Sequence, residues 1–210
     1  MVAKVLYLGT SNPDKATHLT ELVQMVDERL VVRGILNRRL TPPREEGSTE
    51  REIAVAKAAA YAARLGETVL SEDSGIHFHQ SLPVAIGVRI GDANSRIKGS
   101  KLRYWSDLFR RCGASTGYLR KAYAIVTPTA RAVATVDIPF RLTQPRRLPA
   151  GTRNVFNYFM VPKSFRHAVA ALAPYERRRF RALYLVPPLR TILAEVGITA
   201  APPRSPAPHE

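Results

Sequence analysis

The sequence predicts one globular unit of the α/β or α+β class, in one or two lobes, and three observations lead to that prediction. Short β-branched and aliphatic runs, which are typical of strands, alternate with segments of helical periodicity. The chain has 210 residues, of which 45% are hydrophobic, and this is ample material for a core. The composition is not that of a disordered, collagen-like or repeat protein. We therefore expect one domain over residues 1–198, followed by a Pro-rich, disordered tail over residues 199–210.

The chain begins with a strand, a polar loop and a helix. Residues 2–8 form an apolar run that predicts a buried strand, and residues 9–13 are dense in turn-forming residues. Asp14 is placed to cap a helix over residues 15–26. A loop that joins a strand to a helix favours anions, because backbone N–H groups and the helix dipole point into it.

A second strand and a strong helix follow. Residues 30–36 predict the strand, and the Ala-rich residues 50–65 predict the helix. Thr49 and Glu52 fit the capping-box pattern, in which each side chain bonds the other residue's backbone N–H group. Gly66 is suited to end this helix in a left-handed conformation.

The remaining elements are predicted by the same patterns. A short strand over residues 68–70 leads into an acidic turn over residues 71–75, after which residues 76–78 continue the strand. The later segments are a Gly-rich polar stretch (87–100), a helix (101–111), a hairpin pair of strands (121–127 and 132–138), a loop (144–154) and three helices (165–172, 174–185 and 189–196).

The charge of the chain is strongly positive, with 32 Lys+Arg against 17 Asp+Glu and a net charge of +15. Such a surface attracts nucleic acid, anionic membranes or phosphorylated metabolites. The cations are spread in pairs and triples without a basic stripe of interleaved aromatics, so a nucleic-acid partner is not favoured. Two interpretations stay open at this point, a surface that binds polyanions and a merely solvated Arg-rich surface.

Cysteine usage and hydropathy indicate the compartment. Cys112 is the single cysteine, which excludes an internal disulfide and is typical of a reducing environment. The N-terminal apolar run is interrupted by Lys4 and is not a signal peptide. No apolar run approaches the roughly 18–20 residues of a membrane helix. We therefore expect a cytoplasmic protein with no membrane partner.

Three groups of residues can carry chemistry. The first is Thr10-x-Asn12-x-x-Lys15, which gathers a hydroxyl, an amide and an ammonium where a strand turns into a helix. All three groups donate to phosphate oxygens, although a helix-capping turn with a surface lysine explains the same pattern. The second group is Glu52 and Lys57 on the Ala-rich helix, which are about 140° apart around the helix axis and so do not form a simple surface pair.

The third group is Glu72-Asp73-Ser74-Gly75, directly after the apolar strand. Two adjacent carboxylates at the end of a buried strand are costly unless they are paired or bound to a metal. Carboxylate oxygens are the ligands that Mg²⁺ prefers, usually together with waters and substrate phosphates. Glu72 and Asp73 are therefore candidate metal ligands, and the alternative is an Asp-Ser-Gly turn on the surface.

Taken together, the three groups resemble the motifs of the inosine triphosphate pyrophosphatase (Ham1/RdgB-like) family, of which this chain would be a divergent member. The resemblance rests on Thr10-x-Asn12-x-x-Lys15, Thr49-x-x-Glu52-x-Ala54-x-x-Lys57-Ala58 and Glu72-Asp73-Ser74-Gly75-Ile76, in this order and at this spacing. It is best over residues 4–91 and becomes a similarity of pattern to about residue 198. The related Maf proteins have a Ser-x-Ser-x-x-Arg start, which this chain lacks.

The resemblance implies a reaction and a fold. The reaction is the Mg²⁺-dependent hydrolysis of a nucleoside triphosphate between its α- and β-phosphates, which gives a monophosphate and pyrophosphate. The fold is an elongated, two-lobed α/β structure around a long curved mixed β-sheet flanked by helices. The resemblance also implies a homodimer.

The resemblance assigns roles to residues of this chain. Phosphates would be bound by Thr10, Asn12 and Lys15, and their charge would be neutralised by Lys57 and Arg89 as well. Glu52 and Asp73 would hold Mg²⁺, and Asp73 would also orient or deprotonate the attacking water, so the candidate catalytic residues are Asp73, Glu52 and Lys15. Glu72, Ser74 and Gly75 would shape the turn around the site. These roles agree with the needs of phosphoryl transfer, which depends mostly on positioning and on charge stabilisation by metal and cations.

The departures from the family pattern are concentrated where the family reads the base. The family's Asn after Glu52 is Ile53, its Gly-Gly-x-Pro-Gly loop is shortened to Ser81-Leu82-Pro83-Val84, and its Gly-Phe-Gly-Tyr-Asp-Pro segment is Val155-Phe156-Asn157-Tyr158-Phe159-Met160. The late Lys-Asn-x-x-Ser-His-Arg motif is Arg177-Arg178-Arg179-Phe180-Arg181-Ala182-Leu183. In the family, the Asp of the Gly-Phe-Gly-Tyr-Asp-Pro segment recognises the 6-keto edge of hypoxanthine or xanthine. The Lys and the His-Arg pair of the late motif recognise the same edge.

These departures predict a changed base preference. A buried site that loses its hydrogen-bonding partners changes substrate preference by orders of magnitude. Phe156 and Tyr158 remain as rings that could stack on a base, with core packing as the alternative, and Arg177 stands where the family has its Lys. The five histidines show no metal-ligand spacing, and His77 and His79 are expected to face solvent from a strand.

Three hypotheses of function follow. The main one is a Mg²⁺-dependent nucleoside triphosphate pyrophosphatase with a base preference altered from inosine and xanthosine. The second is a non-catalytic descendant that binds a nucleotide or nucleic acid, which the net charge of +15 and the lost base-reading residues suggest. The third is a nucleotide hydrolase that acts on a different phosphate ester.

Overall fold

The fold is built on one mixed six-stranded sheet, seen in a computed structural model that describes residues 4–35, 40–44, 46–84, 86–152 and 154–200. The strand order is β2-β1-β3-β4-β5-β6. β1 is parallel to both of its neighbours, and every other pair is antiparallel. The strands are β1 (Val5–Leu8), β2 (Val31–Gly34), β3 (Val69–Phe78), β4 (Thr116–Val126), β5 (Arg131–Leu142) and β6 (Met160–Pro162).

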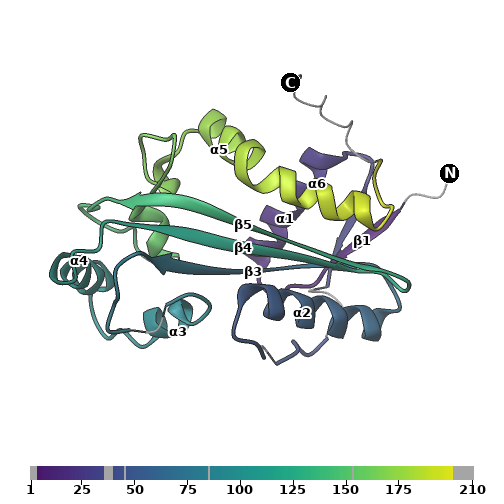
Figure 1. The fold of residues 1–210 in the computed structure, drawn as a ribbon, viewed down its shortest axis with the longest axis horizontal. Coiled ribbons are helices and arrows are strands. Elements are labelled where there is room, and N and C mark those ends of the chain that lie inside the picture. Colours follow the sequence, from purple (N-terminus) through teal and green to yellow (C-terminus); the bar gives the residue numbers. More distant parts are fainter. Residues whose placement is uncertain (1–3, 36–39, 45, 85, 153, 201–210) are drawn as a thin grey trace, which may run out of the picture.

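Helices cover both faces of the sheet, and Figure 1 shows the elongated shape that results. One face carries α2, while α1 and α6 cover the opposite face; α3 and α4 lie at the far end. The helices are α1 (Pro13–Val26), α2 (Glu50–Leu65), α3 (Ile90–Ser95), α4 (Lys101–Arg111), α5 (Pro174–Phe180) and α6 (Val186–Glu195), with a π-helical turn η4 (Arg181–Leu185) between the last two. Short 3-10 turns, η2 (Val155–Tyr158) and η3 (Val169–Ala171), complete the described elements. The predicted fold class is confirmed.

The hydrophobic core has two main parts. One lies between the sheet and the helices α1 and α6 and includes Leu19, Leu22 and Leu189, all fully buried. The other lies at the far end, where Trp105 and Phe109 of α4 pack with residues of β6 and η2. These two clusters lie along one continuous sheet, and different helices cover each of them.

The acidic segment is part of a continuous strand, which corrects the expected turn over residues 71–75. All ten residues of β3 pair with β4, from Val69 opposite Val126 to Phe78 opposite Gly117. Pairing on a neighbouring strand overrides the turn preference of the Asp-Ser-Gly sequence. Successive side chains of a strand point to opposite faces of a sheet, so Glu72 and Asp73 face different layers of helices.

The helix α2 follows the sequence prediction closely. It begins at Glu50 and ends at Leu65, and the capping box between Thr49 and Glu52 is present. Gly66 ends the helix in the left-handed conformation, with φ of 67°. These signals were readable from the sequence because both depend on hydrogen bonds within one helical turn.

Other local expectations are corrected. The N-cap of α1 is Asn12, whose side chain accepts from the backbone N–H groups of Asp14 and Lys15; Asp14 lies inside the helix. The Gly-rich stretch contains α3, and residues 165–172 hold only the short turn η3 in place of a helix. Pro187 and Pro188 fall in the first turn of α6, where missing N–H groups cost nothing, so this helix begins at Val186 and not at residue 189 as expected.

Two further expectations concern the ends and the membrane. No helix within the described ranges is long and apolar enough to cross a bilayer. Most of the expected disordered tail, residues 201–210, lies outside the described residues.

A glycine in the middle of β3 provides a test of the packing around the acidic segment. A Cβ atom at Gly75 would lie 1.9 Å from Oε1 of Glu50 and 2.6 Å from the carbonyl carbon of Gly87. We therefore expect Gly75→Ala to lower the free energy of unfolding by ~2 kcal/mol or more through overpacking, measured by urea denaturation. Gly34→Ala is the control, because a Cβ there meets nothing within 4 Å. Equal stability of the two variants would contradict this packing.

Candidate phosphate-binding site

The loop between β1 and α1 presents polar groups at the start of a helix. Oδ1 of Asn12 accepts hydrogen bonds from the N–H groups of Asp14 at 3.0 Å and Lys15 at 3.3 Å. Oγ1 of Thr10 accepts from the N–H of Asn12 at 3.2 Å. Ser71 of β3 donates to the carbonyl of Gly9 at 3.0 Å and so ties the loop to the sheet. The loop is therefore held in place beside the positive end of the α1 dipole.

A cavity of about 210 Å³ opens at this loop and brings together residues from two of the three motifs. Its lining includes Thr10 and Asn12 from the loop, Lys15 from the first turn of α1 and Lys57 from α2. The rest of the lining is Gly9, Ser11, Pro42, Pro43 and Tyr61. Two ammonium groups, a hydroxyl and an amide thus surround one space, and these are the donors that a phosphate group requires.

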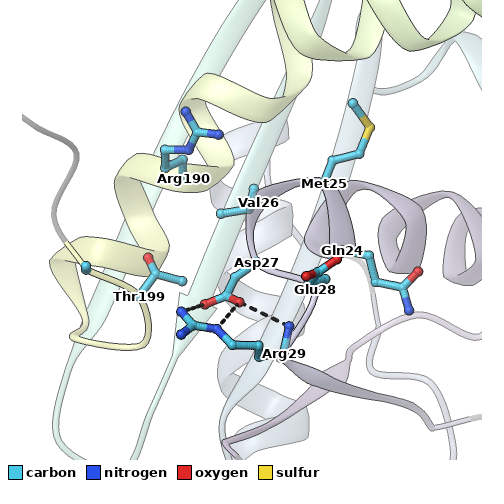
Figure 2. A pocket seen from close by; sticks show the side chains of 9 residues that line it. Gln24, Met25, Val26, Asp27, Glu28, Arg29, Arg190 and Thr199 are labelled. Atoms are coloured by element: carbon cyan, nitrogen blue, oxygen red, sulfur yellow. Dashed lines mark hydrogen bonds and ion pairs between the residues drawn. The ribbon is translucent and has the colours of Figure 1, made fainter.

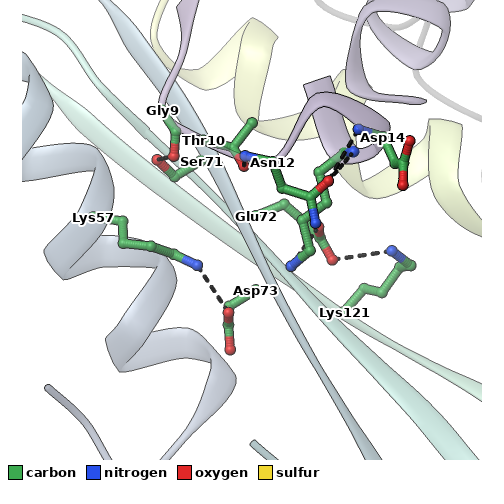
Figure 3. Close-up of polar contacts among 10 residues, drawn as sticks. Gly9, Thr10, Asn12, Asp14, Lys57, Ser71, Glu72, Asp73 and Lys121 are labelled. Carbon is green, nitrogen blue, oxygen red and sulfur yellow. Dashed lines mark hydrogen bonds and ion pairs between the residues drawn. The ribbon is translucent and has the colours of Figure 1, made fainter. Parts of the chain in front are cut away.

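Asp73 faces this side of the sheet and is paired with Lys57. The Nζ atom of Lys57 lies 2.9 Å from Oδ1 of Asp73, and Asp73 is only 7% exposed (Figure 3). Burial raises the pKa of Asp73 above its ordinary value, and the neighbouring Lys57 opposes the shift only in part. A carboxylate whose pKa is raised by burial is suited to accept a proton.

Glu72 faces the opposite side of the sheet and is held by two lysines. Its Oε1 accepts from Lys121 at 3.0 Å, and its Oε2 lies 3.4 Å from Nζ of Lys15. Burial alone would raise the pKa of Glu72, but the ammonium groups of Lys121 and Lys15 outweigh burial and hold the pKa well below its ordinary value. Glu72 is therefore a fixed negative charge whose two oxygens are both engaged by lysines.

The metal assignments differ in how well they fit the structure. Asp73 presents a carboxylate near the donors that line the cavity, which fits Mg²⁺, and its Oδ1 accepts from Lys57. Glu72 points away from Asp73 and is engaged by lysines at both oxygens. The described residues contain no group of three or more His, Cys, Asp or Glu that could hold a metal ion by themselves.

The side chain of Glu52 accepts hydrogen bonds at the N-terminal cap of α2. Its Oε2 accepts from the N–H of Ser48 at 2.8 Å, from Oγ of Ser48 at 2.8 Å and from the N–H of Thr49 at 3.2 Å. Hydrogen bonds from Ser48, first from its backbone and then from its side chain, lower the pKa of Glu52. The capping interpretation of this residue is therefore the one that its contacts match.

Several other candidate residues lie away from the cavity or inside the core. Phe156 is 4% exposed and packs edge to face on Trp105, which is the core-packing alternative, and Tyr158 is half-buried nearby. Ser74 and Gly75 lie within β3, where Ser74 pairs with Lys121 of β4. Arg177 is exposed on α5 and donates to the carbonyl of Leu172 at 2.9 Å.

Arg89 is at the edge of the second lobe, in a cavity of its own. It is exposed, and its Nη1 atom lies 3.9 Å from Oδ2 of Asp92. This second cavity, of about 480 Å³, is also lined by Arg96 and Tyr104. Arg89 does not line the cavity that holds Lys15 and Lys57.

A third cavity lies at the C-terminal end of α1 and contains none of the predicted site residues. It has a volume of about 420 Å³ and is lined by residues 24–29, Arg190, Thr199 and Ala200 (Figure 2). Arg29 and Asp27 form a bidentate ion pair on its wall, with both N···O distances 2.9 Å. The charges on this wall largely cancel, so the cavity lacks the excess of donors found around Lys15.

Two charged groups were missed by the sequence interpretation, and the surroundings of a third residue differ from those expected. Lys121 on β4 was not singled out, and neither was Glu50, which is 1% exposed. Oε1 of Glu50 lies 2.7 Å from Nε2 of His77, whose ring stacks on Tyr118 at 4.8 Å, so His77 is half-buried and not solvent-facing as expected. The signal for Glu50 was its place on the apolar face of α2, three and four residues before the buried Ile53 and Ala54.

The sequence model of the Ham1 family matches residues 6–180. No curated protein matches the chain in sequence. Among solved structures, a HAM1 protein from Coxiella burnetii is 20% identical, with 91% of this chain and 99% of that one covered and a TM-score of 0.68.

Two further structures are similar. The Ham1 protein of Staphylococcus aureus is 17% identical over 92% of this chain and 100% of its own, with a TM-score of 0.65. A nucleoside-triphosphatase described as a dITP/XTP pyrophosphatase, from Mycobacterium abscessus, is 19% identical over 85% and 96% of the two chains, with a TM-score of 0.60. At these identities the likeness establishes the shared fold, and it confirms the expected curved mixed sheet with flanking helices.

His18 on α1 provides a pH-dependent test of the packing around Glu72. Burial, with Lys121 second, lowers the pKa of His18 from 6.5 to about 4. Because the unfolded chain takes up this proton at higher pH, the neutral His18 stabilises the fold above pH 6.5, and that contribution is lost as the pH falls towards 4. At ~1.4 kcal/mol per pKa unit, the loss amounts to ~3 kcal/mol at most.

The measurement compares urea unfolding of the wild type and His18→Gln at several pH values between 7.5 and 4. We expect the stability difference between the two proteins to change in favour of the variant as the pH falls. A difference that is constant with pH would show that His18 titrates normally in the folded state.

Proposed function

The chain belongs to the Ham1 family, and from this premise we propose that it hydrolyses a nucleoside triphosphate to a monophosphate and pyrophosphate. The observation that carries the proposal is the cavity in which Thr10, Asn12, Lys15 and Lys57 meet, with Asp73 bonded to Lys57 beside it. These residues come from three motifs spread over more than sixty positions of the sequence. The likeness to the Mycobacterium abscessus pyrophosphatase supports the same reaction class.

The residues have distinct roles in this proposal. Thr10 and Asn12 hold the phosphate chain at the start of α1, where the helix dipole favours negative charge. Lys15 and Lys57 neutralise the phosphate oxygens, because charge builds up on the leaving pyrophosphate as its bond breaks. The raised pKa of Asp73 suits it to take a proton from the attacking water, through the oxygen that Lys57 does not engage.

The bond changes balance without any redox partner. The water oxygen forms a bond to the α-phosphorus. The bond from the α-phosphorus to the oxygen that bridges it to the β-phosphorus breaks. Pyrophosphate leaves with the bonding electron pair, and the water proton passes to Asp73 and then to solvent. The products are a nucleoside monophosphate and pyrophosphate.

Mg²⁺ is part of the proposal, with Asp73 as its protein ligand. When bound, the metal would supply Lewis-acid stabilisation of the phosphate charge. Because the described residues offer no three-residue metal cluster, the other ligands would be substrate phosphates and waters, as is usual for Mg²⁺. Glu72 is left out of this set, since lysines engage both of its oxygens.

The finer features are proposals as well. The base preference differs from that for inosine or xanthosine, because Phe159 is buried where the family has an Asp and Phe156 is packed into the core. We also propose a cytoplasmic location, which fits the single Cys112, and a homodimer, which fits the family resemblance.

The first test is a panel of nucleoside triphosphates with purified protein and Mg²⁺, assayed for pyrophosphate. We expect release from at least one triphosphate other than inosine and xanthosine triphosphate at a higher kcat/KM than from these two. Release of orthophosphate in place of pyrophosphate would overturn the reaction class. If the protein is folded but releases pyrophosphate from none of the triphosphates, the proposal is wrong.

The second test replaces the proposed base. Asp73→Asn removes the proton acceptor and a metal ligand but keeps the size of the side chain, so we expect kcat to fall by ~100-fold or more. Asp137→Asn is the matched control, because Asp137 is bonded to Arg120 on the exposed edge of β5 and lies outside the cavity. Full activity of Asp73→Asn with unchanged Mg²⁺ dependence would remove Asp73 from the mechanism.

A further inference from the structure

One buried carboxylate holds two lysines from different elements. Glu72 is 2% exposed, and its two oxygens are divided between Lys121 of β4 and Lys15 of α1. Figure 3 shows the contact of Glu72 with Lys121 on the side of the sheet away from Lys57. With both lysines charged, this three-residue cluster has a net charge of +1.

The two lysines are held unequally. The Nζ atom of Lys121 lies 3.0 Å from Glu72, while that of Lys15 lies 3.4 Å away. The side chain of Lys121 is 14% exposed and that of Lys15 is 34% exposed. Of the two, only Lys15 lines the cavity with Thr10 and Asn12.

Within the part of the chain that the structure describes, Glu72 forms ion pairs with Lys121 and Lys15 alone. Tyr123 stands directly opposite Glu72 on β4, but its buried hydroxyl has no hydrogen-bond partner among the described residues. Burial, with Lys121 second, lowers the pKa of nearby His18 to about 4, so this ring is neutral at pH 7 when Lys121 is present. Without Lys121, Lys15 is the remaining lysine that is paired with Glu72.

We infer that Lys121 is a positioning residue for the phosphate site: it balances the charge of Glu72, so that the positive charge of Lys15 acts on the bound phosphate. The inference rests on the proposed function only in taking Lys15 as a phosphate ligand. Lys121 itself need not touch the substrate. A buried carboxylate left with a single cation draws that cation towards itself, because unbalanced buried charge is costly.

The experiment is a double-mutant cycle on Lys121 and Glu72, read out as the affinity for inorganic tripolyphosphate by calorimetry. Lys121→Met removes the charge and keeps the aliphatic stem, which leaves Lys15 to balance Glu72; we expect the Kd to rise about tenfold. Adding Glu72→Gln restores the net charge of +1 on Lys15. We therefore expect the double variant to bind within about twofold to threefold of the wild type.

Arg120→Met is the matched control. Arg120 is the neighbouring residue on the same strand, faces the other side of the sheet, and has its own carboxylate partner in Asp137 at 2.7 Å. The variant loses the same single positive charge, so we expect the Kd to change by less than about twofold at 0.15 M salt. Thermal melting of all variants identifies any that do not fold, and Lys121→Arg, which keeps the charge, should bind like the wild type.

Two outcomes would overturn the inference. If the double variant binds as weakly as Lys121→Met, then Lys121 contacts phosphate directly or acts only through the fold. If Lys121→Met binds like the wild type, then Lys121 has no influence on Lys15.

The same experiment separates this inference from the proposed function, because tripolyphosphate binding requires no hydrolysis. A cycle that shows rescue in a protein without pyrophosphatase activity supports the inference and contradicts the proposed reaction. An active enzyme that shows no rescue supports the proposed reaction and contradicts the inference. Where the enzyme is active, the rescue should appear in KM for the triphosphate, with kcat changed much less.

Discussion

The rest of the structure depends on the neutralisation of two adjacent carboxylates inside one buried strand. Glu72 and Asp73 point to opposite faces of the sheet, so each layer of helices has to supply a cation. Lys57 reaches Asp73 from α2, and Lys15 reaches Glu72 from α1. These pairs connect both helices to β3, and the lysines of both pairs line the cavity.

This arrangement gives the lysines a structural role and, in the proposed function, a chemical one. In the absence of a ligand they balance buried carboxylates, which would otherwise cost several kcal/mol each. In that proposal, a polyphosphate that enters the cavity would meet donors already held in place, so little ordering would be needed on binding. The helix dipole at Asn12 adds to this field. Glu72, which the sequence offered as a metal ligand, is better described as part of the scaffold that holds the lysines.

Local patterns in the sequence predicted the helix α2 with its Glu52 cap and the strand–loop–helix unit, because their signals depend on hydrogen bonds a few residues apart. The continuous strand through Gly75 was missed, since pairing with β4 overrode a composition that favours a turn. The partnership of Lys121 with Glu72 joins residues 49 positions apart, and that of Glu50 with His77 joins residues 27 apart. Nothing in the spacing of a single sequence marks such contacts.

We propose that lysine-paired carboxylates on the two faces of β3 build a site for cleaving a nucleoside triphosphate between its α- and β-phosphates. The most direct measurement is ³¹P NMR of the products when the wild-type protein is incubated with its best triphosphate and Mg²⁺. The account predicts matched growth of the monophosphate and pyrophosphate signals, with no diphosphate at any time. Formation of nucleoside diphosphate and orthophosphate would place the cleavage at another bond and contradict the account.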